Sequence, residues 1–143
     1  MISQQDLEGI DAAWIAIDSR GQVAMFTTGG EGHVPGSAIL STEDAESEVL
    51  ALPEVCGFDL LVNLPHPDDF VAFACRGFFA YDWSDVHSSN KKALGRYELQ
   101  ARPNRPLILT DLPPSLQDLA SSTRLLGASF GSTVIELDIP VGT

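Results

Sequence analysis

The chain has 143 residues, a formal net charge of −12 and a hydrophobic fraction of 44%. The length favours one domain over residues 1–143, and the apolar content argues against disorder despite the charge. A field this acidic repels nucleic acids and anionic membranes, and it favours encounter with a cationic partner.

The acidic residues are concentrated in the N-terminal part of the chain. Residues 1–60 contain eleven Asp and Glu against one Arg, whereas residues 61–143 contain nine acids against seven Lys and Arg. No basic region followed by an apolar stretch opens the sequence, and its apolar runs are too short to span a bilayer. The two cysteines do not make a secreted disulfide framework, so the sequence predicts a cytoplasmic protein.

The first elements in chain order are two β-type runs at 13–17 and 22–28. The short connection between them ends in Gly21, which accepts the positive φ that hairpin loops need. A glycine-rich loop at 29–36 follows. A helix is then expected to begin near Ser41, whose hydroxyl can cap exposed N–H groups, and to end at Pro53.

The second half of the chain alternates between apolar runs and helix starts. The expected elements are a strand at 58–64, a helix at 67–77, a strand at 78–83, strands at 97–101 and 106–110, a helix from 111 or 113 to 121, and a strand at 133–139. Strands are often adjacent and helices are interspersed irregularly, which favours an α+β fold with a mostly antiparallel sheet and about three helices packed against it. The periodicity predicts a core that includes Trp14, Ile15, Ile17, Phe26, Phe58, Leu61, Phe73 and Tyr81.

One short motif suggests metal chemistry. His66-Pro67-Asp68-Asp69 follows an apolar run and resembles the His-Pro-Asp-Asp element of zinc-dependent sugar-amide deacetylases. That chemistry needs a third ligand for the metal. Phe70 stands where that family usually has Glu, and no His-x-x-His occurs downstream. The simpler interpretation is that Pro67 and the two acids begin a helix.

A second cluster holds the residue types of a hydrolytic triad. Asp82, Ser84, Asp85 and His87 lie close together in sequence, but a triad is assembled from separate elements around a nucleophile on a strained turn. No Gly-x-Ser-x-Gly elbow occurs in the chain. We therefore assign no catalytic residue, no metal ligand and no cofactor, and we expect a protein that is not an enzyme.

Two stretches carry a family resemblance. They are Trp14–Asp18 through Gly21 with Val23–Thr28, Gly32 and Pro35, and Gly77–Asp85 with Tyr97–Pro103 and Pro106–Leu107. Together they resemble the small acidic immunity proteins that bacteria encode beside polymorphic toxins of contact-dependent or type VI secretion systems. Many such proteins neutralise nuclease toxins by covering a basic active-site cleft. The resemblance implies a cytoplasmic antidote for a cognate toxin, and the charge of the chain independently favours the same class of partner.

The acids and one aromatic residue supply the expected binding residues. These are Glu31, Glu43, Asp44, Glu46 and Glu48, with Asp82, Trp83 and Asp85 as an aromatic-centred patch. Two interpretations compete for the helix acids, since acids at a helix start also complement its dipole. A zinc hydrolase and a non-catalytic acidic adaptor remain as alternative functions, and the sequence leaves self-association open.

Overall fold

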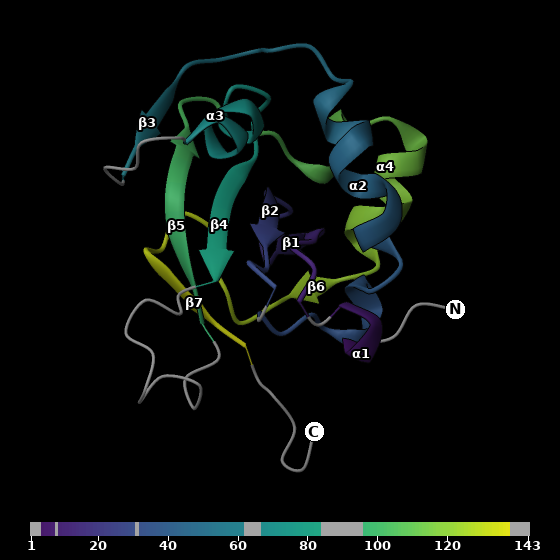
Figure 1. The fold of residues 1–143 in the computed structure, drawn as a ribbon. Coiled ribbons are helices and arrows are strands. Elements are labelled where there is room, and N and C mark those ends of the chain that lie inside the picture. The colour runs from purple at the N-terminus through teal and green to yellow at the C-terminus, as the bar shows by residue number, and fades with distance from the viewer. Residues whose placement is uncertain (1–3, 8, 31, 62–66, 84–95, 138–143) are drawn as a thin grey trace.

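The computed structural model of the protein describes residues 4–7, 9–30, 32–61, 67–83 and 96–137 (Figure 1). Its helices are α1 Gln4–Leu7, α2 Ser41–Leu50, α3 Asp68–Ala74 and α4 Pro114–Ser121, with short 3-10 turns at Gly36–Ala38 and Leu109–Asp111. Its strands are β1 Ala13–Asp18, β2 Val23–Thr27, β3 Phe58–Leu60, β4 Phe79–Trp83, β5 Arg96–Pro103, β6 Arg124–Leu125 and β7 Val134–Glu136.

These strands of the described chain form one sheet in the order β3-β5-β4-β2-β1-β6, and β7 pairs with β5. The pairs β1–β2, β4–β5, β3–β5 and β5–β7 are antiparallel, whereas β2–β4 and β1–β6 are parallel. The fold is therefore α+β with a mostly antiparallel sheet, as the sequence predicts.

The sheet separates two hydrophobic cores. On one face, α2, α3 and α4 cover a core that includes Ile15, Met25 and Phe73, and α2 contacts both other helices. On the opposite face, Trp14 and Phe26 stack at 4.1 Å between ring centroids. We call these the helix face and the aromatic face. Both cores share the apolar run of β1, which is buried along its whole length, and this explains why that run is apolar at every position.

The C-terminal segment closes the aromatic face. Its first strand, β6, pairs with β1, and its last strand, β7, pairs with β5 at the other side of the sheet. Between them Phe130 packs into the aromatic core, 5.8 Å from the ring centroid of Phe26. Residues 124–136 therefore cross the sheet and join strands that are distant in its order.

The structure confirms six of the eight predicted core residues, and it contradicts two. Phe58 and Leu61 are exposed at 37% and 42%. The reason is that β3 is an edge strand, paired on one side with β5 only. Apolar content correctly placed a strand here, but it could not reveal that the strand lies at the border of the sheet.

One predicted strand needs correction, and two others have different bounds. The run at 106–110 is not a strand of the sheet, because it contributes only one isolated bridge, between Gln22 and Ile108, before the turn Leu109–Asp111. The predicted strand at 133–139 is confirmed over Val134–Glu136, while residues 138 and 139 lie outside the described part. The predicted strand at 97–101 is confirmed as β5, which extends to Pro103.

Candidate partner-binding surface

The helix α2 carries acids on both sides of its buried stripe. Ser41, Ala45 and Val49 recur at a spacing of four and are buried against the sheet. Residues between these positions must face outward or sideways. Glu43 and Glu46, three apart, lie on one side of the stripe, and the helix turns its other acids to the opposite side. The four acids of α2 therefore form two pairs and not one continuous face.

The contacts of α2 identify which neighbour each pair faces. The Glu48 carboxylate accepts a short hydrogen bond from the Ser115 hydroxyl of α4, so Glu48 and Asp44, four residues apart, turn toward α4. Glu46 lies close enough to Asp69 of α3 for that carboxylate to influence its pKa. Glu43 and Glu46 consequently border the space between α2 and α3.

Ser41 fixes the start of α2 on the sheet. The backbone N–H of Ile15 donates to its hydroxyl oxygen at 3.3 Å, and the hydroxyl donates to the Ala38 carbonyl at 2.7 Å. Leu40 occupies the N-cap position and makes no side-chain capping bond. The predicted capping role of Ser41 is therefore wrong, because this hydroxyl satisfies a strand N–H in place of a helix N–H.

A polar row crosses the sheet beside α2 and α3. In the register of the strands Thr27 lies opposite Asp82, and Asp82 lies opposite Glu98. Met25 and Ala80 belong to the helix-face core, so the residues two positions later, Thr27 and Asp82, return to that face. The Thr27 hydroxyl donates to the Asp82 carboxylate at 2.6 Å. Three neighbouring strands thus present one hydroxyl and two carboxylates at the end of the sheet.

The pKa of Glu46 links this glutamate to two acids that lie far from it in the sequence. Partial burial raises this pKa, and the carboxylates of Asp69 and Asp11 raise it further. Asp11 precedes β1 and accepts a hydrogen bond from the Gly29 N–H at 3.0 Å. Burial also raises the pKa of Tyr97, and Asp82 and Asp11 add to that effect. Asp11 therefore lies within electrostatic range of both the helix acids and the polar row.

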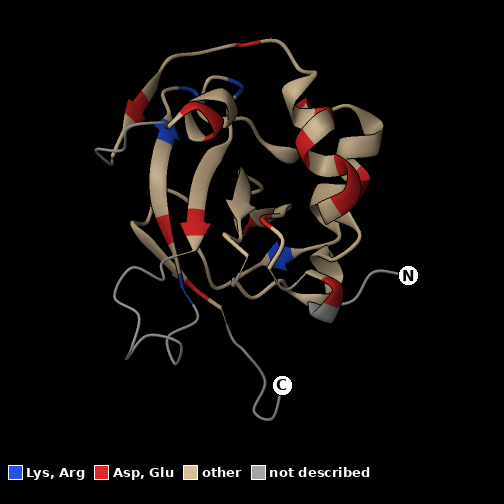
Figure 2. Ribbon diagram, in the orientation of Figure 1, with Lys and Arg blue, Asp and Glu red and all other residues tan. Residues whose placement is uncertain are grey.

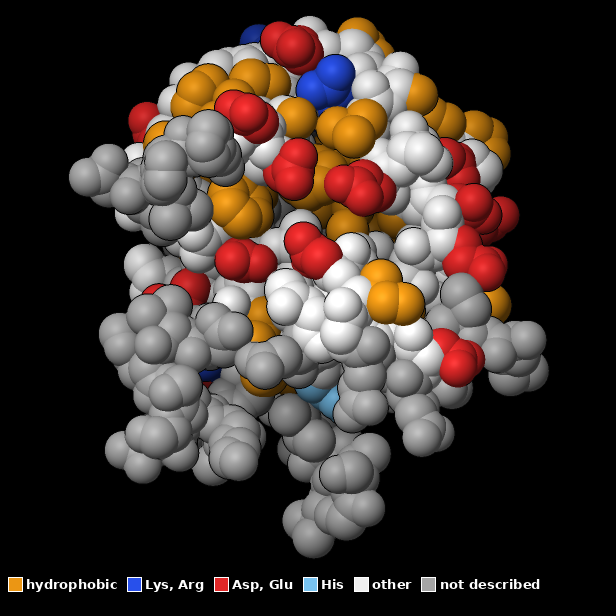
Figure 3. All heavy atoms as spheres, in the orientation of Figure 1, with side chains coloured by type: hydrophobic (Ala, Val, Ile, Leu, Met, Phe, Trp, Pro, Cys, Tyr) orange, Lys and Arg blue, Asp and Glu red, His pale blue; other side chains and the backbone are white. Residues whose placement is uncertain are grey.

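We call the resulting set the acidic surface: Asp11, Glu43, Glu46, Asp69, Asp82 and Glu98. In Figure 2 acidic residues mark the end of β4, the part of β5 near its start, the start of α3 and the length of α2. Figure 3, from the same side, shows acidic side chains gathered around apolar ones in the middle of this face. Such an arrangement can hold cationic side chains, because carboxylates accept charge-assisted hydrogen bonds and apolar neighbours pack against long aliphatic stems.

The aromatic-centred patch is divided by the sheet. Trp83 belongs to the aromatic face, where its ring meets that of Tyr97 edge-on at 5.1 Å, while Asp82 points to the helix face. Glu31 and Asp85 lie outside the described residues. Of the predicted binding residues, Glu43 and Glu46 share one side of α2, and Asp82 lies on the face of the sheet that α2 covers. Asp11, Asp69 and Glu98 are not among the residues predicted from the sequence, because their placement depends on strand order and helix packing.

A buried hydrogen-bond chain supports the polar row from the aromatic face. The Trp14 indole N–H donates to the Tyr97 hydroxyl at 3.1 Å, and that hydroxyl donates to the His33 carbonyl at 2.9 Å. Tyr97 lies next to Glu98 on β5, so the strand that carries this carboxylate is held by a fully buried ring. The acidic surface is therefore built on ordered strands and helices, which limits its conformational freedom before binding.

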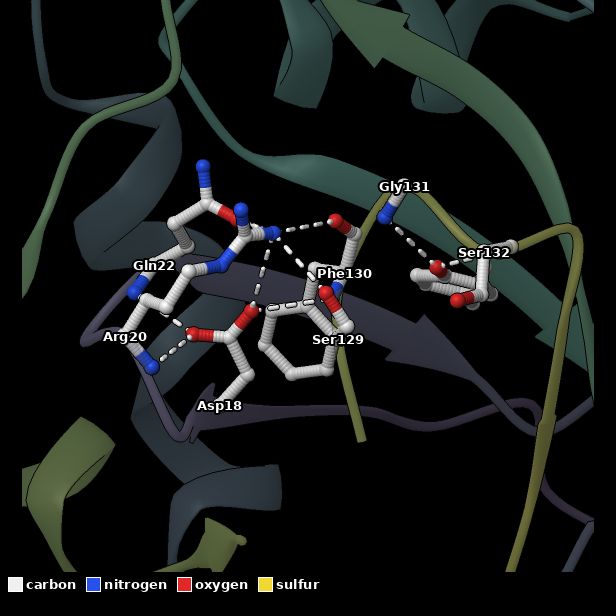
Figure 4. Close-up of polar contacts among 8 residues, drawn as sticks. Asp18, Arg20, Gln22, Ser129, Phe130, Gly131 and Ser132 are labelled. Carbon is white, nitrogen blue, oxygen red and sulfur yellow. Dashed lines mark hydrogen bonds and ion pairs between the residues drawn. The ribbon is translucent and has the colours of Figure 1, made fainter. Parts of the chain in front are cut away.

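One acid of the N-terminal part does not belong to any surface. The Asp18 side chain is fully buried, and one of its oxygens accepts the N–H groups of Arg20 and Gln22 at 2.9 Å each. Its other oxygen accepts the Phe130 N–H at 2.8 Å and lies 4.0 Å from the Arg20 guanidinium (Figure 4). Arg20 also donates to the Ser129 hydroxyl at 2.9 Å. Asp18 thus joins the β1–β2 hairpin to the C-terminal segment.

Only part of the candidate metal motif lies within the described residues. His66 lies outside the described residues, whereas Asp68 and Asp69 occupy the first turn of α3 and are exposed. Within the described ranges no group of three or more His, Cys, Asp and Glu side chains is placed to hold a metal ion. The helix start is the interpretation that the described geometry supports. Of the second cluster, only Asp82 is described.

In the described portion no helix has the length and apolar character needed to cross a membrane. No protein-family model, no curated protein and no solved structure matches this chain.

Proposed function

We propose that this protein binds a cationic surface of a partner protein through the acidic surface, and that it acts as an immunity protein for a basic toxin. The observation that carries this proposal is the placement of carboxylates from α2, α3 and one end of the sheet on the same side of the sheet. Carboxylates within electrostatic range repel one another, as Asp69 and Asp11 do Glu46, so each gains when a cation enters between them.

The raised pKa of Glu46 offers a way to measure how much a bound cation relieves the repulsion between these carboxylates. Its burial and its neighbours Asp69 and Asp11 disfavour the charged carboxylate. A bound guanidinium or ammonium group has the opposite effect and lowers the pKa again. The ion pairs within the described residues join Asp18 to Arg20 and Asp59 to Arg102, so neither uses Glu43 or Glu46. These two glutamates remain available for charges from a partner.

A toxin that cleaves nucleic acid suits this surface. Its active-site cleft must be basic to hold phosphates, and an acidic protein can occupy the same cleft. Complementary charges raise association rates up to about 10⁸–10⁹ M⁻¹s⁻¹ at low salt, which favours an antidote that must capture its target quickly. This function requires no chemistry from the chain itself. The resemblance to immunity proteins points to the same class of partner.

The proposal requires a toxin domain encoded beside this protein's gene, which is the arrangement typical of immunity proteins, and the test uses that domain. The variant Glu43→Lys/Glu46→Lys should slow association with that toxin by about tenfold or more at low salt and should reduce the salt dependence of the rate. It should also lose the ability to protect growing cells from the expressed toxin. Stopped-flow or surface-based binding kinetics at several ionic strengths would measure the first effect.

A matched control separates the local surface from the overall charge. Asp118→Lys/Glu136→Lys changes the net charge by the same amount at two exposed residues outside the acidic surface. This variant should retain most of the association rate and full protection. Equal losses for both double variants would show that only the net charge matters. Binding without any protection would favour the acidic adaptor instead.

A further inference from the structure

Among the described strands, none pairs with the outer edge of β3. The Asn104 N–H donates to the Gly57 carbonyl at 2.9 Å, and the Leu61 N–H donates to the Gln100 carbonyl at 2.8 Å. Backbone groups alternate in direction along a strand, so residues 57, 59 and 61 turn theirs toward β5. Phe58 and Leu60 must turn theirs outward, and no described strand pairs on that side.

This edge is also apolar on both faces. Val55, Phe58, Leu60 and Leu61 are exposed at 41%, 37%, 38% and 42%, and they supply four of the nine large hydrophobic residues that are exposed in the described chain. Phe58 and Leu60 lie opposite Pro103 and Ala101, so they share the helix face, and Leu61 lies on the other face. An apolar strand edge with open backbone groups is a template for pairing with another strand.

The charges around β3 indicate which partner strand can pair with its outer edge. All six arginines of the chain are described, and Arg76, Arg102 and Arg105 lie beside this segment. Arg76 donates to the Leu52 carbonyl at 2.9 Å, Arg102 pairs with Asp59 at 3.2 Å, and Arg105 follows Asn104, which bonds Gly57. The acids nearby are Glu54 and Asp59 on the same segment and Asp68 and Asp69 at the start of α3, which contacts β3. This border is therefore close to neutral on a chain whose formal charge is −12.

We propose that two copies of this chain pair through β3 in an antiparallel, two-fold symmetric manner. Two chains of equal negative charge repel over most of their surfaces, and β3 is the apolar border where that repulsion is locally cancelled. With Asp59 at the symmetry axis, Phe58 of one copy lies opposite Leu60 of the other, and each such pair exchanges two backbone hydrogen bonds. The Arg102 guanidinium beside each Asp59 offsets the repulsion between the two central carboxylates.

This inference does not depend on the proposed function. Helix α2 packs over β1, which stands on the other side of β2, β4 and β5 from β3 in the sheet order. The pairing therefore leaves α2 uncovered, and Glu43 and Glu46 remain accessible in each copy. Failure of toxin binding and failure of dimerisation would be separate results, because they are read from different residues.

Sedimentation velocity of the full chain over a wide concentration range tests the proposal. We expect a concentration-dependent dimer whose association constant falls by about tenfold or more in Leu60→Lys and in Phe58→Lys, since each change removes buried apolar area and places a charge at the interface. Leu126→Lys is the matched control, because Leu126 is 67% exposed and lies outside β3. It should leave the dimer unchanged. Circular dichroism and thermal unfolding should show that all variants are folded.

Hydrogen exchange provides a second measurement on the unaltered chain. The amide protons of Phe58 and Leu60 should exchange more slowly as concentration rises, while exchange at Leu126 should not change. A chain that stays monomeric at every concentration would overturn the proposal. So would a dimer that survives both β3 variants, or one that Glu43→Lys/Glu46→Lys abolishes instead.

Discussion

The acidic surface and the β3 edge belong to the same sheet, but they attract partners by different physical effects. On the acidic surface Glu46 and Asp69 gather negative charge on helices already packed against the core. At the β3 edge charges nearly cancel, and exposed apolar side chains lie beside open backbone groups. The first surface acts at long range and weakens with salt, whereas the second acts only on contact. A highly charged chain can therefore still have a nearly neutral surface, such as the β3 edge, at which a second copy can approach without strong repulsion.

The largest expected effect tests whether β3 is a true border. Phe73→Ala should lower the free energy of unfolding by about 3–5 kcal/mol, because it leaves a cavity in the helix-face core. Phe58→Ala removes the same ring from the exposed edge and should cost about 1 kcal/mol or less. Denaturant titration at low protein concentration would measure both. Similar losses would mean that Phe58 is covered, and the contrast between the two regions would fail.

A second prediction asks whether the acids of the N-terminal part stabilise the fold, by comparing one buried acid with one exposed acid. Asp18→Ala leaves three backbone N–H groups without their acceptor and should lower the free energy of unfolding by about 2–3 kcal/mol. Glu43→Ala, at an exposed position of α2, should change it by about 0.5 kcal/mol or less. Thermal unfolding monitored by circular dichroism would compare them. A costly Glu43 variant would show that the helix acids maintain the fold.

The smallest effect concerns Glu46. The pKa of the Glu46 carboxyl is raised in the folded protein, so the folded state binds a proton there more tightly than the unfolded chain does. The free energy of unfolding therefore falls as pH rises from the unfolded pKa of this carboxyl through its folded pKa. Glu46→Gln should therefore be more stable than the unaltered chain at neutral pH, by about 0.5 kcal/mol or less because solvent screens this exposed carboxylate. The advantage should disappear at a pH below both pKa values. Unfolding measured across this range checks the sign, and a variant less stable at neutral pH would contradict it.

The sequence predicted the elements better than their environment. Apolar runs located β1, β2 and β4, and the spacing of Phe73 identified the buried side of α3. The same signal placed Phe58 in the core, because a run of apolar residues does not reveal how many neighbours its strand has. The hairpin turn was predicted from Gly21, which has a φ of 79°.

The candidate surface was predictable only in part. Alternation along a strand already separates Asp82 from Trp83, so their placement on opposite faces could have been found from the sequence. The spacing in α2 likewise divides Glu43 and Glu46 from the other helix acids. The approach of Asp69 and Asp11 to Glu46 could not be found this way, since it depends on how α3 and β1 pack around α2. The burial of Asp18 depends in turn on Phe130, more than a hundred residues later.

The path of the C-terminal segment has a consequence for synthesis of the protein. Residues 124–136 cross the aromatic face, so a growing chain that has reached residue 123 holds Trp14, Phe26 and Tyr81 without their last cover. At a translation rate of about 5–20 residues per second this exposure lasts for a second or so, and longer while the segment is still inside the ribosome. During that time the stacked aromatic rings are a natural target for chaperones. The aromatic face is therefore complete only after residues 124–136 have left the ribosome and crossed the sheet.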